Sequence, residues 1–179
     1  MKIHVTRTAF TLALLTAAAA AQASAGPFSI AIGATPCADA MKKIGATALD
    51  GDAKAGVGIA ESNAVDHLYP GAKTALIFCD AGKVEMAGFG VNKSFGNPAG
   101  QELYKNLSAK YKRIGGGPIP NVGNGYALFD AGDAIVELDS PHLSFEVSVT
   151  YYSKKVWAAR QTRQQERAAK QARAKKDAL

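Results

Sequence analysis

Residues 74–91 read TALIFCDAGKVEMAGFGV and decide the fold. The segment from Thr74 to Cys79 is apolar on both faces, which is typical of a strand in the centre of a sheet. Asp80-Ala81-Gly82 has the composition of a tight turn, and Val84 to Val91 can run back beside the first strand. This stretch therefore predicts a β-hairpin within an antiparallel sheet.

A helix is predicted before the hairpin. Thr35 can cap this helix, and Pro36 can occupy its first position, where a proline is tolerated. Gly45 ends a stripe of apolar residues at i, i+3, i+4 and i+7, which consists of Cys37, Ala40, Met41 and Ile44. Short strands are expected on either side of the helix, at Phe28–Ile32 and Val57–Ala60.

The second half of the chain repeats this layout. Asn97 and Pro98 offer another capped helix start. A stripe at i, i+4, i+8 and i+11 then predicts a helix that ends at Gly115; its members are Leu103, Leu107, Tyr111 and Ile114. A loop rich in Gly and Pro, residues 115–125, leads into a second hairpin at 126–138.

A last strand is expected at residues 145–152, where one face carries Phe145, Val147, Val149 and Tyr151. Both hairpins contain Asp-Ala-Gly turns, at 80–82 and 130–132, which indicates either an internal duplication or a chance likeness. The whole pattern predicts the α+β class: an antiparallel sheet with helices on one face, built from two helix–hairpin units within residues 26–153. A projecting C-terminal helix is expected to follow at 154–179.

The N-terminus has the three parts of a secretory signal. Lys2 and Arg7 give a positive start, an apolar stretch follows, and small residues then allow cleavage after Ala23 or Ala25. The apolar stretch is too short to cross a ~30 Å hydrocarbon core. Residues 1–25 are therefore predicted to be a signal peptide, whose removal near Ala25 leaves a soluble periplasmic protein that is not integral to the membrane.

The cysteine content agrees with an exported protein. Cys37 and Cys79 are the two cysteines of the chain, and an oxidising compartment favours their pairing. Cys37 lies on the buried stripe of the predicted helix, so a bridge to Cys79 would fix the helix start to the sheet. Two separate buried thiols are the alternative.

Charge is distributed unevenly along the chain. Residues 26–153 contain 10 Lys or Arg and 13 Asp or Glu, whereas residues 154–179 contain 9 and 2. Strong helix formers dominate the second segment, which predicts a basic helix in solvent. This helix either only aids solubility or meets an acidic protein partner or an anionic envelope surface, and export makes nucleic acid an unexpected partner. The residues proposed for contact are Arg160, Arg163, Arg167, Lys170, Arg173, Lys175 and Lys176.

Residue types that carry catalysis or hold metals are sparse. His67 and His142 lie outside any known spacing of metal ligands, so no metal site is expected. The chain has no nucleotide-binding or nucleophile motif, so no cofactor is expected. Glu137 and Asp139 are predicted on the solvated face of a strand. A hydrolase based on two carboxylates stays open as an alternative, because their separation cannot be obtained from sequence.

These features favour a periplasmic binding or assembly module without catalytic activity. The alternative is an inhibitor or immunity-type protein that blocks a secreted hydrolase or toxin. In that case a loop would enter the cleft of the partner, and the candidate loop contains Asn121, Asn124 and Tyr126. Tyr126 would be its anchor, because aromatic residues dominate binding hot spots. The competing interpretation is that Tyr126 starts a strand and packs inward.

Overall fold

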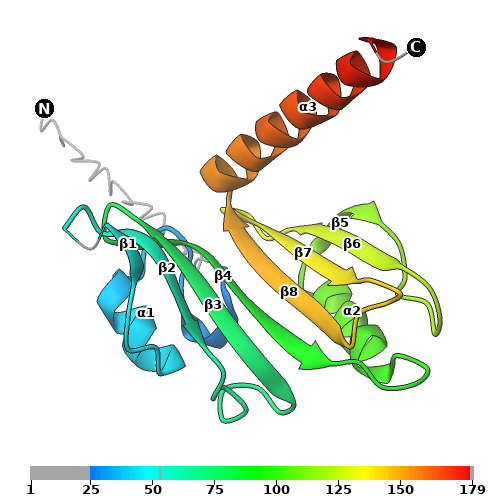
Figure 1. Cartoon of the computed structure of the whole chain (residues 1–179). Helices are drawn as coiled ribbons and strands as arrows, with labels where there is room; N and C mark the ends of the chain where they lie inside the picture. The colour runs from blue at the N-terminus through cyan, green and yellow to red at the C-terminus, as the bar shows by residue number, and fades with distance from the viewer. Residues whose placement is uncertain (1–24, 53, 178–179) are drawn as a thin grey trace, which may run out of the picture.

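The computed structural model describes residues 25–52 and 54–177. This part of the chain forms one eight-stranded antiparallel sheet with three α-helices, which confirms the α+β class (Figure 1). The elements follow in the order η1 (Pro27–Ser29), α1 (Cys37–Ile44), β1 (Asp50–Asp52), β2 (Val57–Ser62), β3 (Ala72–Asp80), β4 (Lys83–Asn92), α2 (Pro98–Lys110), β5 (Lys112–Gly116), β6 (Gly125–Asp130), β7 (Ala134–Ser140), β8 (Glu146–Ser153) and α3 (Lys154–Asp177).

The sheet consists of two halves with the same order of elements. Its strand order is β1-β2-β3-β4-β8-β7-β6-β5, so each half is a helix followed by four strands in succession, and the halves join along β4 and β8. Each predicted helix–hairpin unit is thus present, and each contains four strands in place of the two of a hairpin. The two Asp-Ala-Gly turns are not equivalent, however. Residues 80–82 join β3 to β4, the third and fourth strands of the first half, whereas residues 130–132 join β6 to β7, the second and third strands of the second half. The shared tripeptide is therefore no evidence for duplication.

The predicted helices α1 and α2 cover the same face of the sheet, and the core lies beneath them. A row of paired residues crosses five strands on this face, and all are buried: Ala75, Phe89, Val149, Leu138 and Ala127. Leu103 and Leu107 of α2 are buried against the row, and each such side chain stabilises the fold by about 1.5–3 kcal/mol. The opposite face, called the open face below, is left without α1 or α2.

The predicted disulfide is present between Cys37 and Cys79, whose Cα atoms lie 5.9 Å apart. The helix that it anchors starts one residue later than expected, at Cys37. Thr35 does not cap the helix, because its hydroxyl accepts a hydrogen bond from the Ala31 N–H at 2.8 Å. At the other end, Gly45 stops the helix with a left-handed φ of 74°, as predicted.

The predicted first strand, Phe28–Ile32, is wrong. Pro27 to Ser29 forms a short 3₁₀ turn, in which Phe28 has a left-handed φ of 56°. Pro27 has no N–H to give to a sheet. Ile30 and Ile32 are buried without joining a strand.

The second predicted helix runs four residues too far. It ends at Lys110, and Lys112–Gly116 forms the edge strand β5 instead, with Ile114 49% exposed. Pairing with β6 supplies the backbone hydrogen bonds that the helix would have supplied. Gly116 has a φ of 64°, and a Cβ on it would lie 2.0 Å from the Tyr126 carbonyl oxygen, so the close approach of β6 requires glycine.

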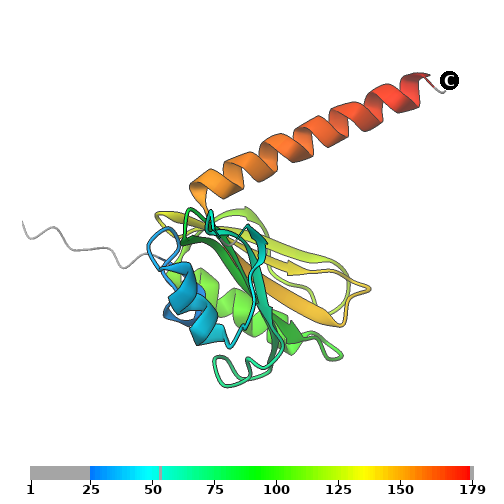
Figure 2. The same ribbon diagram turned by 60° about the vertical axis from the view of Figure 1, so that its left-hand side comes forward.

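The predicted C-terminal helix, α3, leaves the end of β8 and extends away from the sheet (Figures 1 and 2). Most of its length is exposed after the first two turns. Within the described ranges, no helix is both long and apolar enough to span a membrane. The predicted signal peptide and its cleavage positions lie outside the described residues, apart from Ala25.

Candidate functional site

Three loops meet at the end of the sheet opposite α3, at the lower right of Figure 1. They are residues 93–97 after β4, 117–124 after β5 and 141–145 after β7. Each loop presents large apolar side chains to solvent, with exposed fractions of 97%, 66%, 90% and 89% for Phe95, Val122, Leu143 and Phe145. We call these four residues the apolar tip. Single exposed apolar residues are ordinary, whereas a group at one end of a fold is typical of an interaction site.

The side chain of Asn97 holds the three loops together. Asn97 is 3% exposed, and its amide donates to the Ser140 hydroxyl at 2.9 Å and to the Pro120 carbonyl oxygen at 3.3 Å. Asn97 is the N-cap residue of α2 and Pro98 opens the helix, as predicted, but the Asn97 side chain makes no cap hydrogen bond to α2. Asn97 has a left-handed φ of 52°, a conformation that asparagine tolerates better than most residues.

His142 and Lys93 make further hydrogen bonds between the same loops. The Gly123 N–H donates to His142 Nδ1 at 3.2 Å, and the Lys93 N–H donates to the Phe145 carbonyl oxygen at 2.8 Å. The Lys93 ammonium donates to the Pro141 carbonyl oxygen. The backbone under the apolar tip is therefore held before any partner arrives, which lowers the entropic cost of binding.

The structure places the residues proposed from sequence for the binding loop in two settings, within the 117–124 loop and on β6. Asn124 accepts a hydrogen bond from the His142 N–H at 2.7 Å, and Asn121 accepts one from the Gln101 amide, so both hold the loop in place. Tyr126 lies on β6 with its side chain on the open face, 40% exposed. Burial, followed by the charge of Glu137, raises the pKa of Tyr126. Tyr126 therefore lies on a strand beyond the 117–124 loop, and it does not pack fully inward.

Sequence reasoning missed the apolar tip itself. The sequence predicts Phe145 in the last strand, on the same face as Val147 and Val149, whereas β8 begins one residue later and leaves Phe145 in solvent. Phe95 and Leu143 stand among turn-forming residues, in Ser94-Phe95-Gly96 and His142-Leu143-Ser144. A large apolar residue within a turn was the available signal, because such a turn has no buried face to receive it.

The other candidate region, α3, is tied to the open face near its start. Arg160 makes a bidentate ion pair with Glu137, with 3.1 Å between Nη2 and Oε1, and its guanidinium lies 5.1 Å from the Tyr152 ring centroid. The Tyr152 hydroxyl also donates to Glu137 at 3.0 Å. Burial raises the pKa of Tyr152 to about 12, with Glu137 contributing. The prediction that Glu137 is solvated is wrong, because α3 folds over it and leaves it 8% exposed.

The basic residues of α3 fall into two groups. Arg160 and Arg163 border a hollow on the open face that also contains Ile59, Phe78, Met86 and Tyr152. The remaining residues proposed for contact are exposed and lie beyond the sheet: Arg167, Lys170, Arg173, Lys175 and Lys176. They provide positive charge over a long, straight helix (Figure 2).

Comparison of this chain with protein-family models, with curated proteins and with solved structures finds no match. Among residues 25–52 and 54–177, no three His, Cys, Asp or Glu side chains gather as metal ligands would. The polar side chains described at the tip make hydrogen bonds to the backbone of the loops, and the side chains that face solvent there are apolar. This arrangement is suited to covering apolar surface on another molecule.

Proposed function

We propose that this protein is a binding or assembly module without catalytic activity, which acts in the periplasm and holds a protein partner through the apolar tip. One observation carries the proposal: four large apolar side chains are exposed on three loops that hydrogen bonds hold in place. Preformed aromatic anchors are the usual source of binding energy in protein interfaces.

A protein partner fits the tip better than a membrane surface does. Anionic lipids attract clusters of Lys and Arg beside inserted apolar residues. Lys93 is the cation of the tip loops, and its ammonium already donates hydrogen bonds to backbone carbonyl oxygens. The main group of cations is on α3, at the other end of the eight residues of β8. About 25 Å of strand separates the two ends, so one flat surface does not contact both at once.

Export is part of the proposal, and the structure favours one of the two predicted cleavage positions. Ala25 is buried, its N–H donates to Asp133 at 3.2 Å, and its carbonyl oxygen accepts from the Ile32 N–H at 3.2 Å. Cleavage after Ala23 keeps these contacts, whereas cleavage after Ala25 removes them. We expect the intact mass of the periplasmic protein to begin at Ser24, and a full-length chain recovered in the membrane fraction would contradict export.

The exposed part of α3 has a secondary role in this proposal. Its positive charge draws an acidic partner, or an anionic envelope surface, toward the protein. Such attraction between exposed charges weakens as salt rises, because the Debye length falls to about 10 Å at 0.1 M. Contact at the tip involves apolar surface and depends little on salt.

An inhibitor or immunity-type protein remains the second candidate. Phe95 favours it, because a fully projecting aromatic ring on a fixed loop can enter a cleft in an enzyme. Both candidates use the same tip. They differ in the partner: a bound hydrolase or toxin would lose activity, whereas an assembly partner would not.

The test compares three immobilised proteins in an envelope extract: the unchanged chain, F95S/F145S, and the control I114S. Ile114 is also exposed and apolar, but it lies on the edge strand β5. We expect one partner to be retained by the unchanged protein and by I114S, and lost with F95S/F145S. Equal retention by all three would contradict binding through the tip.

A further inference from the structure

The two halves of the sheet leave a gap in the layer that covers it. On the helix side, α1 packs on β2, β3 and β4, and α2 packs on β6 and β7. The line where β4 pairs with β8, called the seam below, lies between the two helices. Residues Phe89, Val149 and Tyr151 of the seam face this gap. The short segments around Phe28 and Tyr69 cover it in part, and a cavity of about 240 Å³ remains.

Two aromatic side chains form one wall of the seam cavity. The rings of Phe28 and Tyr69 each lie 5.1 Å from the ring of Phe89, centroid to centroid. Phe28 reaches this position with a left-handed φ of 56°, which is unfavourable for any residue other than glycine. The surrounding structure therefore holds Phe28 in an unfavourable backbone conformation beside the cavity, as is common at ligand sites.

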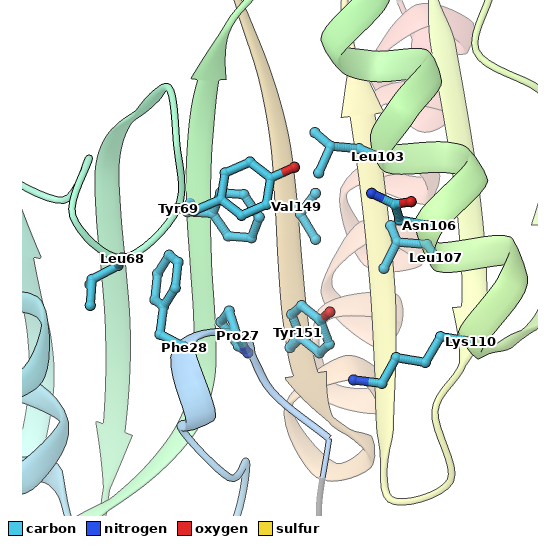
Figure 3. A pocket seen from close by; sticks show the side chains of 11 residues that line it. Pro27, Phe28, Leu68, Tyr69, Leu103, Asn106, Leu107, Lys110, Val149 and Tyr151 are labelled. Atoms are coloured by element: carbon cyan, nitrogen blue, oxygen red, sulfur yellow. The ribbon is translucent and has the colours of Figure 1, made fainter.

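The opposite wall belongs to α2. Figure 3 shows Leu103, Leu107 and Asn106 directed from this helix toward the seam, with Phe28 and Tyr69 across from them. The Lys110 side chain extends from the same helix across the edge of the cavity (Figure 3), and its ammonium lies 5.0 Å from the Tyr111 ring centroid. Lys110 is the one charged residue among the eleven that line the cavity. An apolar space thus has a single positive group and an amide on one side.

We propose that the seam cavity binds an amphiphile with one short apolar tail and a carboxylate, the tail lying over Phe89 and Val149 and the carboxylate meeting Lys110. The volume suits this occupant, because an apolar cavity of about 150 Å³ takes up benzene and the seam cavity is larger. The charge also suits it, because a cation at the mouth of an apolar site favours an anionic end. Asn106 can donate a second hydrogen bond to the same carboxylate.

The hydroxyl groups around the cavity are compatible with this occupant. Burial raises the pKa of Tyr151, and burial followed by the charge of Glu102 raises the pKa of Tyr69. Both phenols therefore stay neutral at the pH of the envelope and do not repel an anion. A cationic amphiphile would place its charge near Lys110 with no acidic lining residue to balance it.

The experiment titrates the protein with sodium decanoate below its micelle concentration, and follows it by calorimetry and by amide chemical shifts. Decyltrimethylammonium and decanol are the comparison probes. We expect saturable binding of one decanoate, with the largest shifts at Leu103, Leu107 and Val149, and at least fivefold weaker binding of the cationic probe. Equal binding of the cation, no saturation, or largest shifts at Phe95 and Phe145 would each overturn the proposal.

Three variants test separately whether binding depends on the charge of Lys110 and on the free volume of the cavity. K110Q is expected to weaken decanoate binding about fivefold and to leave decanol unchanged, whereas the matched control K105Q, on the same helix, changes neither. L68W enlarges a partly buried side chain that lines the cavity, and it should abolish binding of both probes while the melting temperature stays within a few degrees. Unchanged decanoate binding in K110Q and L68W would show that the ligand lies elsewhere.

Discussion

The apolar tip and α3 stand at opposite ends of β8 and differ in almost every physical respect. The tip has uncharged side chains on three short loops, which buried hydrogen bonds hold to one another. The exposed part of α3 has many charges on one long helix, which only its first turns tie to the sheet. A fixed apolar surface suits a close and specific contact, whereas exposed surface charge suits attraction at a distance.

This difference also separates stability from function. The ion pair between Arg160 and Glu137 belongs to the body of the protein, whereas the sequence predicts Arg160 in a solvated tail. The apolar residues of the tip contribute little to the core, because they are exposed. Changes at the tip should therefore alter binding without altering folding, and changes at the start of α3 should do the reverse.

The largest expected effect concerns the disulfide, which lies at the α3 end of the sheet. Its 42-residue separation predicts that C37A/C79A lowers the free energy of unfolding by about 4 kcal/mol in the chain-entropy model. The tip should keep its partner, because the bridge is remote from loops 93–97 and 141–145. Urea denaturation measures the first effect. A loss below 1 kcal/mol would show that the bridge does little for the fold.

The next largest effect concerns Asn97, whose hydrogen bonds hold the loops of the tip together. N97A removes the hydrogen bonds to Ser140 and Pro120 and places alanine in a left-handed conformation, so we expect a loss of about 2 kcal/mol. Amide exchange in residues 117–124 should become faster. The control N92A, at an exposed position, should stay within about 0.5 kcal/mol of the unchanged protein. Equal exchange in both variants would contradict the role given to Asn97.

A pair of truncations divides α3 into its structural and its exposed part. A chain ending at Trp157 loses Arg160 and with it the ion pair to Glu137, so we expect the free energy of unfolding to fall by about 1–2 kcal/mol. A chain ending at Thr162 keeps the pair and should melt within about 2 °C of the full chain. Both should lose salt-dependent binding to anionic vesicles. Equal melting of the two truncated chains would show that the Arg160 pair contributes no stability.

The smallest effect is a pH dependence near the tip. Burial, followed by the charge of Glu137, raises the pKa of Asp139 in the folded protein. Ionised Asp139 therefore costs stability above its folded pKa, and the cost disappears as pH falls below its unfolded value of about 3.9. We expect D139N to melt slightly higher than the unchanged protein at pH 7 and equally at pH 3. A lower melting temperature at pH 7 would mean that the carboxylate has a favourable ionic partner.

Local patterns in the sequence were sufficient for most of the fold. The hairpin at 74–91, the end of α1 at Gly45 and the pairing of the two cysteines all depend on neighbouring residues or on a single possible partner. Errors arose where a pattern continued past the element that produced it. The apolar stripe of α2 continues into Ile114 on β5, and the alternation of β8 continues back into Phe145.

The candidate site could not be predicted because it is not local. Phe95, Val122 and Leu143 come together only when three loops from both sides of the seam meet, and no short pattern links them. The burial of Glu137 likewise depends on Arg160, which is 23 residues away. The open-face position of Tyr126 follows from its register opposite Asp139. Each of these outcomes depends on tertiary packing.

The most direct measurement places a photoreactive benzoylphenylalanine at Phe95 in one chain and at Arg167 in another, in living cells. The residues represent the tip and the exposed part of α3. We predict that illumination links the Phe95 variant to one discrete partner. The same product should form when the illumination is carried out at 300 mM salt. The Arg167 variant should give weak, salt-sensitive products. A discrete partner at Arg167, with none at Phe95, would contradict the proposal that the tip is the binding site.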